Sequence, residues 1–239
     1  MIGDKLTECS LRRPEVGAVL DRLHREAERQ HGPGRGIRRR IPGGLDLVLG
    51  RKPSVRQEAH RQRDLYLSIS RQQGVFAYLV GRSINAQRIV EFGTSFGIST
   101  IYLAAAVRDN GGGLVIGSEI EPGKAQQAQN HVEEAGLADY VDIRLGDARQ
   151  TLTDPGGEVD MVLMDGSKRL YLPIIKMLTP SLRPGAVVLS DNVGNKGRVL
   201  APYLAHMHDA RNGFQSVTVP FRSGLEYSVR LPAPERAQD

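Results

Sequence analysis

The sequence predicts an α/β protein built on one mostly parallel sheet, and three observations carry this prediction. From residue 88 onward, short apolar runs alternate with helical stretches, which is typical of βαβ units. The runs are rich in Val, Ile and Leu without polar alternation, as in strands covered on both faces. The chain of 239 residues, 40% hydrophobic and 25% charged, is long enough for one substantial core plus an appendage.

The appendage is expected to be a helical N-terminal extension over residues 1–69, followed by the main domain over residues 70–239. Between Val16 and Ala27, apolar residues recur every third or fourth position, and Pro14 suits a helix start. Glycine and proline residues then interrupt the helical pattern. The extension is expected to cover the substrate entrance, to form a dimer contact, or both. The helices expected in this part of the chain cover residues 15–30, 54–68 and 74–84.

Seven strands are expected in the main domain. The last two flank the turn sequence "FRSG" and predict an antiparallel hairpin at the sheet edge. Among the helices between the strands, one has Pro122 at a first helical position and Gly136 just past its end. The expected strands are 88–92, 114–118, 141–145, 159–164, 186–190, 215–220 and 225–231. The expected helices are 97–107, 122–135, 168–178 and 197–210.

The positive charge is concentrated at the N-terminus. Residues 1–74 contain 16 Lys and Arg against 9 Asp and Glu, whereas the formal charge of the whole chain is +5. The run Arg38 to Arg40 is able to attract nucleic acid, an acidic substrate or an acidic partner. Most such runs are solvated faces, and no aromatic residues are interleaved here, so a solvated face is favoured.

Composition also excludes several classes of protein. No apolar run of about 18 residues and no secretory signal is present, so a cytoplasmic protein without membrane association is expected. The single cysteine, Cys9, excludes an internal disulfide framework and a cysteine-rich metal site. None of the six histidines is assigned to catalysis, and four are expected in polar surroundings: His24, His31, His60 and His131.

The stretch "VEFGTSFGIST", residues 90–100, joins the first strand of the sheet to a helix. Open α/β sheets bind ligands at this end of a strand, and glycines there let the backbone approach a ligand. Ser95 occupies the second glycine position of a dinucleotide fingerprint, which disfavours a pyrophosphate. Glu119 ends the second strand, where a carboxylate is able to accept hydrogen bonds from both hydroxyls of a ribose. A ribose ligand without a pyrophosphate is therefore expected.

These motifs resemble those of the class I S-adenosylmethionine-dependent methyltransferases, which have a Rossmann-like, seven-stranded, mostly parallel sheet with a C-terminal antiparallel hairpin. The resemblance rests on "EFGTSFGIS", on Glu119 and on "GDA" at residues 146–148. It implies that S-adenosylmethionine is the cofactor, that Ser99 and the amides near Gly93 hold its methionine part, and that the "GDA" loop flanks its adenine. The cofactor-binding residues implied are Ile69, Ser70, Glu91, Gly93, Thr94, Ser95, Gly97, Ser99, Glu119, Asp147, Ala148 and Asp165.

Polar side chains follow two further strands of the expected sheet. Asp165 ends one strand, and Asp191 and Asn192 end another. Adjacent strand ends lie about 5 Å apart, so these side chains are able to converge, and their oxygens suit Mg²⁺. A cation there would favour the neutral form of Lys168, which would then serve as a base. The alternative is structural, since a strand-end aspartate is often only a helix N-cap.

With this set, the resemblance narrows to the cation-dependent O-methyltransferases, the group of the catechol and caffeoyl-CoA enzymes, over residues 70–231. It implies Asp165, Asp191 and Asn192 as metal ligands and Lys168 as the catalytic base, and Tyr171 also falls on a position that is commonly Tyr. The sequence departs from the family at Gly166 and Ser167, where bulkier residues stand in catechol methyltransferase. The segment before residue 70 matches nothing that we assign.

We therefore expect an enzyme that transfers a methyl group from S-adenosylmethionine to one of two adjacent hydroxyls on a small aromatic molecule, with Mg²⁺ or another divalent cation, as a homodimer. Three alternatives stay open at this point. An RNA methyltransferase on the same fold would use the Arg38 to Arg40 region as an electrostatic guide, although nucleic acid is disfavoured. A nicotinamide-dependent oxidoreductase is disfavoured by Ser95, and a non-catalytic binding protein by the complete ligand set.

Overall fold

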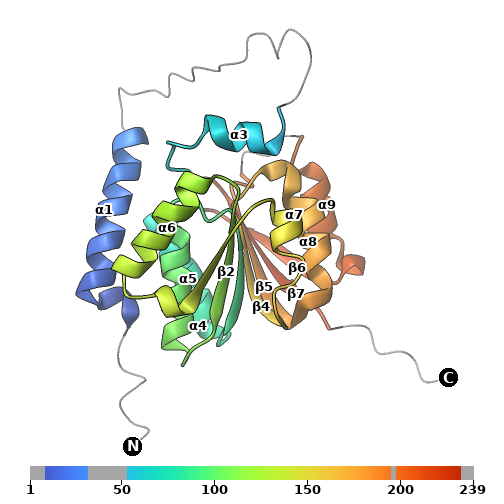
Figure 1. Ribbon diagram of the computed structural model, residues 1–239. Helices are drawn as coiled ribbons and strands as arrows, with labels where there is room; N and C mark the ends of the chain where they lie inside the picture. The colour runs from blue at the N-terminus through green and yellow to red at the C-terminus, as the bar shows by residue number, and fades with distance from the viewer. Residues whose placement is uncertain (1–8, 32–52, 195–197, 233–239) are drawn as a thin grey trace, which may run out of the picture.

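The computed structural model describes residues 9–31, 53–194 and 198–232 (Figure 1). Its centre is one seven-stranded sheet with the strand order β3-β2-β1-β4-β5-β7-β6. The expected strands are confirmed, and the largest difference is that β5 begins at Leu182, four residues before the expected start. The strands are β1 Arg88–Phe92, β2 Leu114–Glu119, β3 Val141–Leu145, β4 Val159–Met164, β5 Leu182–Asp191, β6 Phe214–Val219 and β7 Leu225–Arg230.

Pairing in the sheet is parallel from β3 to β5, and β7 runs antiparallel to both β5 and β6. The order of the parallel strands reverses between β1 and β4, since β1 pairs with both β2 and β4. In an open α/β sheet, ligands bind outside the carboxyl ends of the strands at such a switch point. The sheet order therefore locates the candidate site before any side chain is considered.

Helices cover both faces of the sheet (Figure 1). One apolar core includes residues of α1, α4, α5 and α6, and a second lies on the other face with α7, α8 and α9. Helix α3 lies across the carboxyl edge of the sheet (Figure 1). The helices are α1 Pro14–His31, α3 Val55–Arg61, α4 Arg71–Ser83, α5 Ile98–Asp109, α6 Pro122–Glu134, α7 Ala148–Thr151, α8 Tyr171–Leu178 and α9 Ala201–His208.

The prediction of a helix over residues 54–68 is wrong for its second half, because α3 ends at Arg61. The chain that follows is held by tertiary contacts. Lys124 Nζ donates to the carbonyl of Leu65 at 3.0 Å, and the Tyr66 ring stacks on Phe96 with 4.3 Å between centroids. These contacts hold the segment against the sheet edge, and sequence periodicity does not reveal them.

Other helix boundaries differ for local reasons. Helix α4 begins three residues earlier than expected, because Ser70 and Gln73 form a capping box at its start. The expected helix 168–178 opens with a 3₁₀ turn at Lys168–Leu170 before α8, and α9 is shorter than the expected 197–210. Helix α7 was not expected, and Asp147 caps it. The Arg38 to Arg40 run lies outside the described residues.

Pro122 stands in the first turn of α6, and Gly136 follows its end with φ +66°, so both expected boundary signals are confirmed. Within the parts of the chain that the structure describes, we find no helix with the length and apolar character needed to cross a membrane.

Candidate active site

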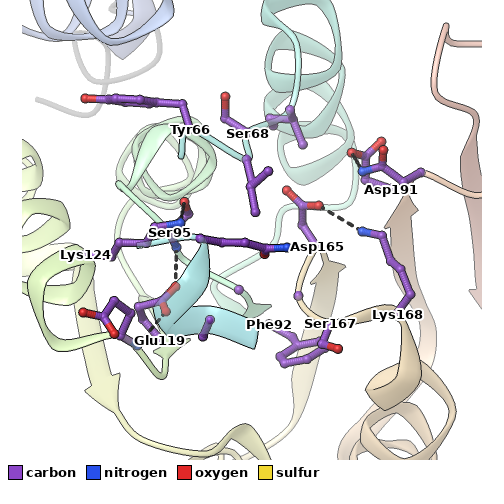
Figure 2. A pocket seen from close by; sticks show the side chains of 18 of the residues that line it. Tyr66, Ser68, Phe92, Ser95, Glu119, Lys124, Asp165, Ser167, Lys168 and Asp191 are labelled. Atoms are coloured by element: carbon purple, nitrogen blue, oxygen red, sulfur yellow. Dashed lines mark hydrogen bonds and ion pairs between the residues drawn. The ribbon is translucent and has the colours of Figure 1, made fainter. Parts of the chain in front are cut away.

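A cavity of about 930 Å³ opens at the carboxyl edge of the sheet, beside the switch point. Typical ligand pockets have volumes of about 300–1,000 Å³, so this one has room for a nucleoside cofactor together with a small second molecule. Helix α3 and the segment 66–71 line it together with the ends of β1, β2, β4 and β5. Figure 2 shows Glu119, Ser95 and Lys124 in one part of this cavity and Asp165, Lys168 and Asp191 in another.

The turn after β1 has a backbone that only glycine fits. Gly93 has φ +99°, and a Cβ there would lie 2.6 Å from the amide nitrogen of Gly166. The amides of Gly93 and Thr94 both donate to the carbonyl of Ser118, at 3.1 and 3.2 Å. These two amides therefore tie the turn to β2, and Gly93 itself lines the cavity.

Glu119 is held rigidly at the end of β2. Its Oε2 accepts the Ser95 amide at 2.8 Å, and its Oε1 accepts the amides of Ile120 and Glu121, both at 2.8 Å. A carboxylate offers about four acceptor positions, so about one is left for a ligand in this arrangement. Glu119 is 7% exposed and faces the cavity.

Four of the residues expected to bind cofactor do not line the cavity: Glu91, Thr94, Gly97 and Ser99. Glu91 is fully buried, and its Oε2 accepts hydrogen bonds from Thr94 and Thr100 at 3.0 and 2.6 Å. Burial raises the pKa of this carboxyl. The hydroxyls of Thr94 and Thr100 hold Glu91 beneath the turn, and contact of Glu91, Thr94, Gly97 and Ser99 with a cofactor stays a prediction. The expected residues that do line the cavity are Ile69, Ser70, Gly93, Ser95, Glu119, Asp147, Ala148 and Asp165.

The "GDA" loop lies in the wall of the cavity, and its aspartate has a structural task as well. Asp147 caps α7 by accepting the amide of Arg149 at 3.0 Å, and it also accepts from the guanidinium of Arg149. The hydrogen bond from that guanidinium holds the pKa of Asp147 below its ordinary value. The loop thus lines the cavity, and the carboxylate of Asp147 is hydrogen-bonded to Arg149.

The expected acidic set comes together at the ends of β4 and β5. Asp165, Asp191 and Asn192 all line the cavity. Burial raises the pKa of Asp165 to about 8, and the nearby charge of Asp191 adds to this although Lys168 opposes it. Asp191 Oδ1 accepts from Gln73 Nε2 at 2.5 Å and from Ser223 Oγ at 3.0 Å, while Oδ2 accepts from Asn192 Nδ2 at 2.5 Å.

This donor set fits a divalent cation. Two carboxylates beside one amide supply hard oxygen ligands, and both are shielded from solvent, since the Asp165 side chain is 7% exposed and Asp191 is 3% exposed. Burial is the main cause of the raised pKa of Asp165, and the negative charge of Asp191 adds to it. The third donor is an amide, and no cluster of three His, Cys, Asp or Glu suited to a metal occurs in the described part of the chain. The charge at the site therefore favours a cation, although the ligand count depends on Asn192.

Tyr171 positions the candidate base. Its buried hydroxyl donates to the carbonyl of Met164 at 2.6 Å and accepts from Lys168 Nζ at 2.9 Å. Lys168 Nζ also lies 3.5 Å from Asp165 Oδ1. Burial raises the pKa of Tyr171 well above its ordinary value, so the tyrosine stays protonated and the amine is held at the cavity wall.

The departure at Gly166 has a physical reason in this chain. A Cβ at Gly166 would lie 2.4 Å from the ring of Phe92, which itself lines the cavity. The Phe92 ring therefore occupies the space that a larger side chain at position 166 would need.

Sequence reasoning missed several residues of the site. The sequence carries one signal for Gln73: Ser70 followed three residues later by Gln is a capping-box pattern, which indicates a helix start but not a place in the site. Lys124, 5% exposed, and Ser223 carried no local signal because distant segments bring them to the cavity. His24 has polar neighbours as expected, among them the Tyr102 hydroxyl at 3.1 Å, but it is buried at 5% exposure and lines the cavity, which the sequence did not predict.

The comparisons agree with this geometry. The family described as "Methyltransferase domain" matches residues 90–193, which contain the glycine turn, Glu119 and the acidic set. Together with the sheet order, this match supports the Rossmann-like methyltransferase fold that the sequence motifs predict. More particularly, the chain is similar in sequence to proteins described as catechol O-methyltransferases and in structure to an O-methyltransferase solved with S-adenosylmethionine.

Two relatives by sequence and one solved structure illustrate these similarities. The chain is 38% identical over 136 residues to a catechol O-methyltransferase of Mycobacterium tuberculosis, covering 56% of this chain and 61% of that protein. It is 36% identical over 138 residues to a catechol O-methyltransferase of Niastella koreensis, covering 56% and 62%. The O-methyltransferase TomG of Streptomyces achromogenes, solved in complex with S-adenosylmethionine, has a TM-score of 0.64 at 25% identity, covering 82% of this chain and 100% of that one. The chain thus spans about three fifths of the length of these two curated relatives.

Proposed function

We propose that the protein is an S-adenosylmethionine-dependent and divalent-cation-dependent O-methyltransferase that acts on a small, catechol-like molecule with two adjacent hydroxyls. The observation that carries this proposal is one cavity that contains both Glu119 and the set Asp165, Asp191, Asn192 and Lys168. The first group suits the ribose of the cofactor, and the second suits a cation and an acceptor hydroxyl. The catechol O-methyltransferases among the relatives support the same acceptor class.

The cofactor is proposed to lie along the ends of β1 and β2, with Glu119 holding its ribose and the loop 146–148 beside its adenine. Ile69 and Ser70 also line the cavity. Because Gly93 has no side chain, the backbone of the turn is able to approach the cofactor closely. TomG, solved with S-adenosylmethionine, supports this choice of cofactor.

Asp165, Asp191 and Asn192 would hold Mg²⁺ or a similar cation, which when bound supplies positive charge that acidifies and orients an acceptor hydroxyl. Lys168 takes the proton of that hydroxyl at Nζ, and Tyr171 holds Lys168 in place for this step. Helix α3 and the segment 66–71 line the cavity, and we expect positioning and electrostatics within it to supply most of the rate.

Helix α3 of the N-terminal extension is proposed to cover the acceptor site. Val55, Glu58 and Ala59 of α3 line the cavity, and Arg169 of the 3₁₀ turn donates to Glu58 at 2.6 Å, which ties α3 to the catalytic side. A cytoplasmic location and a homodimer remain part of the proposal, and light scattering on purified protein would measure the oligomeric state.

Methyl transfer from labelled S-adenosylmethionine to a panel of catechol-type acceptors tests the function. Turnover should be lost with a chelator, return with added Mg²⁺, and fall at least about 10²-fold in Asp191→Ala. The exposed Asp139→Ala variant is the matched control and should behave as wild type. Turnover that survives both the chelator and Asp191→Ala would overturn the cation dependence. Absence of turnover with every acceptor, although S-adenosylmethionine raises the thermal midpoint, would overturn the acceptor class.

A further inference from the structure

Gln73 is a buried polar side chain that the proposed chemistry leaves without a task. It belongs to the first turn of α4 and is 4% exposed, yet it lines the cavity beside Asp191. Burying an amide requires hydrogen-bond partners for both of its ends. Those partners lie on three separate segments of the chain, so Gln73 joins parts of the site that are far apart in the sequence.

The orientation of the amide follows from its partners. Gln73 Oε1 accepts from the backbone nitrogen and from the hydroxyl of Ser70, both at 2.9 Å. Gln73 Nε2 donates to Asp191 Oδ1 at 2.5 Å and to Ser223 Oγ at 3.2 Å. A backbone N–H is only able to donate and an ionised carboxylate only to accept, so the reverse orientation would break the contacts at both ends.

The same oxygen of Asp191 has a second donor. Ser223, in the turn between β6 and β7, donates to Asp191 Oδ1 at 3.0 Å. Two neutral donors therefore engage Oδ1, whereas Oδ2 is engaged by the amide of Asn192, itself an expected ligand. Neutral donors engage a carboxylate without placing a competing positive charge in a cation site.

We propose that Gln73, assisted by Ser223, is a positioning residue that orients the Asp191 carboxylate for cation binding and couples this ligand to the start of α4. This inference rests on the proposed function, because it assigns a role to Gln73 within the same cation site. Partners that orient the ligands of a metal typically change its affinity by about 10–100-fold when they are removed. The coupling also links the cation to Ser70 and hence to the segment that lines the cofactor part of the cavity.

Titration of the purified protein with Mn²⁺ alone, followed by its electron paramagnetic resonance signal, tests this role without any turnover. Gln73→Met keeps the length of the side chain and removes the donor. We expect its Kd for Mn²⁺ to rise about tenfold, and Ser223→Ala to shift the Kd in the same direction. Gln72→Met is the matched control, since Gln72 is exposed in the same helical turn, and its Kd should equal that of wild type.

Rescue separates positioning from a structural role. If Gln73 acts through Asp191, saturating Mg²⁺ should restore the methyl transfer rate of Gln73→Met, because the lost affinity is overcome by mass action. A Kd within twofold of wild type in folded Gln73→Met overturns the inference. If that variant does not fold, an unchanged Kd in Ser223→Ala overturns it. Absence of Mn²⁺ binding by wild type would instead refute the cation dependence in the proposed function, and the two failures are thus distinguishable.

Discussion

At the scale of single residues, Lys168 is the side chain that we propose as the base. Its amine lies between the Tyr171 hydroxyl, at 2.9 Å, and Asp165, at 3.5 Å. General bases typically contribute about 10²–10⁴-fold to a rate. Lys168 lies in the part of the cavity proposed for the chemical step, whereas Glu119 lies in the part proposed for the ribose (Figure 2).

Replacing Lys168 should therefore affect the rate and spare the cofactor. We expect Lys168→Ala to lower kcat by about 10²–10⁴-fold, and Lys168→Arg to do the same because a guanidinium does not give up its proton. Calorimetric titration should show S-adenosylmethionine affinity within twofold of wild type for both. Near-normal turnover in Lys168→Arg would exclude the lysine as the base.

A second residue-scale feature is His24, which should make stability depend on pH. Burial lowers its pKa below 6.5, and the charge of Arg71 adds to this. Well above pH 6.5 the imidazole is neutral in both the folded and the unfolded protein. As the pH falls through 6.5 the unfolded chain takes up a proton that the folded protein resists, so stability is lost on acidification.

The measurement is urea unfolding at pH 7.5 and pH 5.5. The free energy of unfolding should fall more between these values in wild type than in His24→Gln, which keeps a polar side chain opposite Tyr102 but does not titrate. His60→Gln is the control, because His60 is exposed. An identical fall in wild type and His24→Gln would contradict the assignment.

At the scale of elements, the close packing of α4 on α5 depends on Gly74. A Cβ at Gly74 would lie 2.3 Å from the ring of Tyr102, which is 2% exposed and bonded to His24. Alanine normally stabilises a helix by about 1 kcal/mol relative to glycine. Forcing an extra group into a packed core costs about 1–3 kcal/mol, so packing should outweigh propensity here.

We thus expect Gly74→Ala to lower the free energy of unfolding by about 1–2 kcal/mol despite its better helix propensity. Gly17→Ala in α1 is the matched comparison, since no atom lies within 4 Å of a Cβ there. That variant should gain about 0.5–1 kcal/mol. Urea denaturation measures both, and stabilisation of both variants would show that α4 and α5 adjust freely.

At the scale of the whole molecule, α1 packs into the same apolar core as α4, α5 and α6. Leu23 of α1 is fully buried in that core. The division at residue 69 remains a prediction, but this packing joins the first helix to the main domain through a shared core. Such packing favours one cooperative unfolding unit.

Leu23→Ala tests this cooperativity. Removing a buried leucine typically costs about 2–5 kcal/mol, and the loss should appear in the unfolding of the whole chain. Far-ultraviolet circular dichroism and tyrosine fluorescence should report one coincident transition in both wild type and variant. Leu67→Ala, at a side chain that is 42% exposed, should have a smaller effect. Separate transitions by the two probes would show that α1 folds independently of the sheet.

The sequence alone determined the seven strands, the position of the glycine turn, and the groups Asp165, Lys168, Asp191 and Asn192. These features follow from local apolar runs and from strand ends, which must meet at one edge of a parallel sheet. The same local logic located Glu119, the family resemblance indicated the loop 146–148, and the structure places all of these groups in one cavity.

Only the tertiary structure decided how those groups are supported. The hydrogen bonds from Lys124 to Leu65 and from Gln73 to Asp191 join residues 59 or more positions apart. The tertiary structure also shows that Glu91, Thr94, Gly97 and Ser99 are not among the residues that line the cavity. The physical reason is that local patterns encode the elements, whereas contacts between distant segments select which buried polar groups face a ligand.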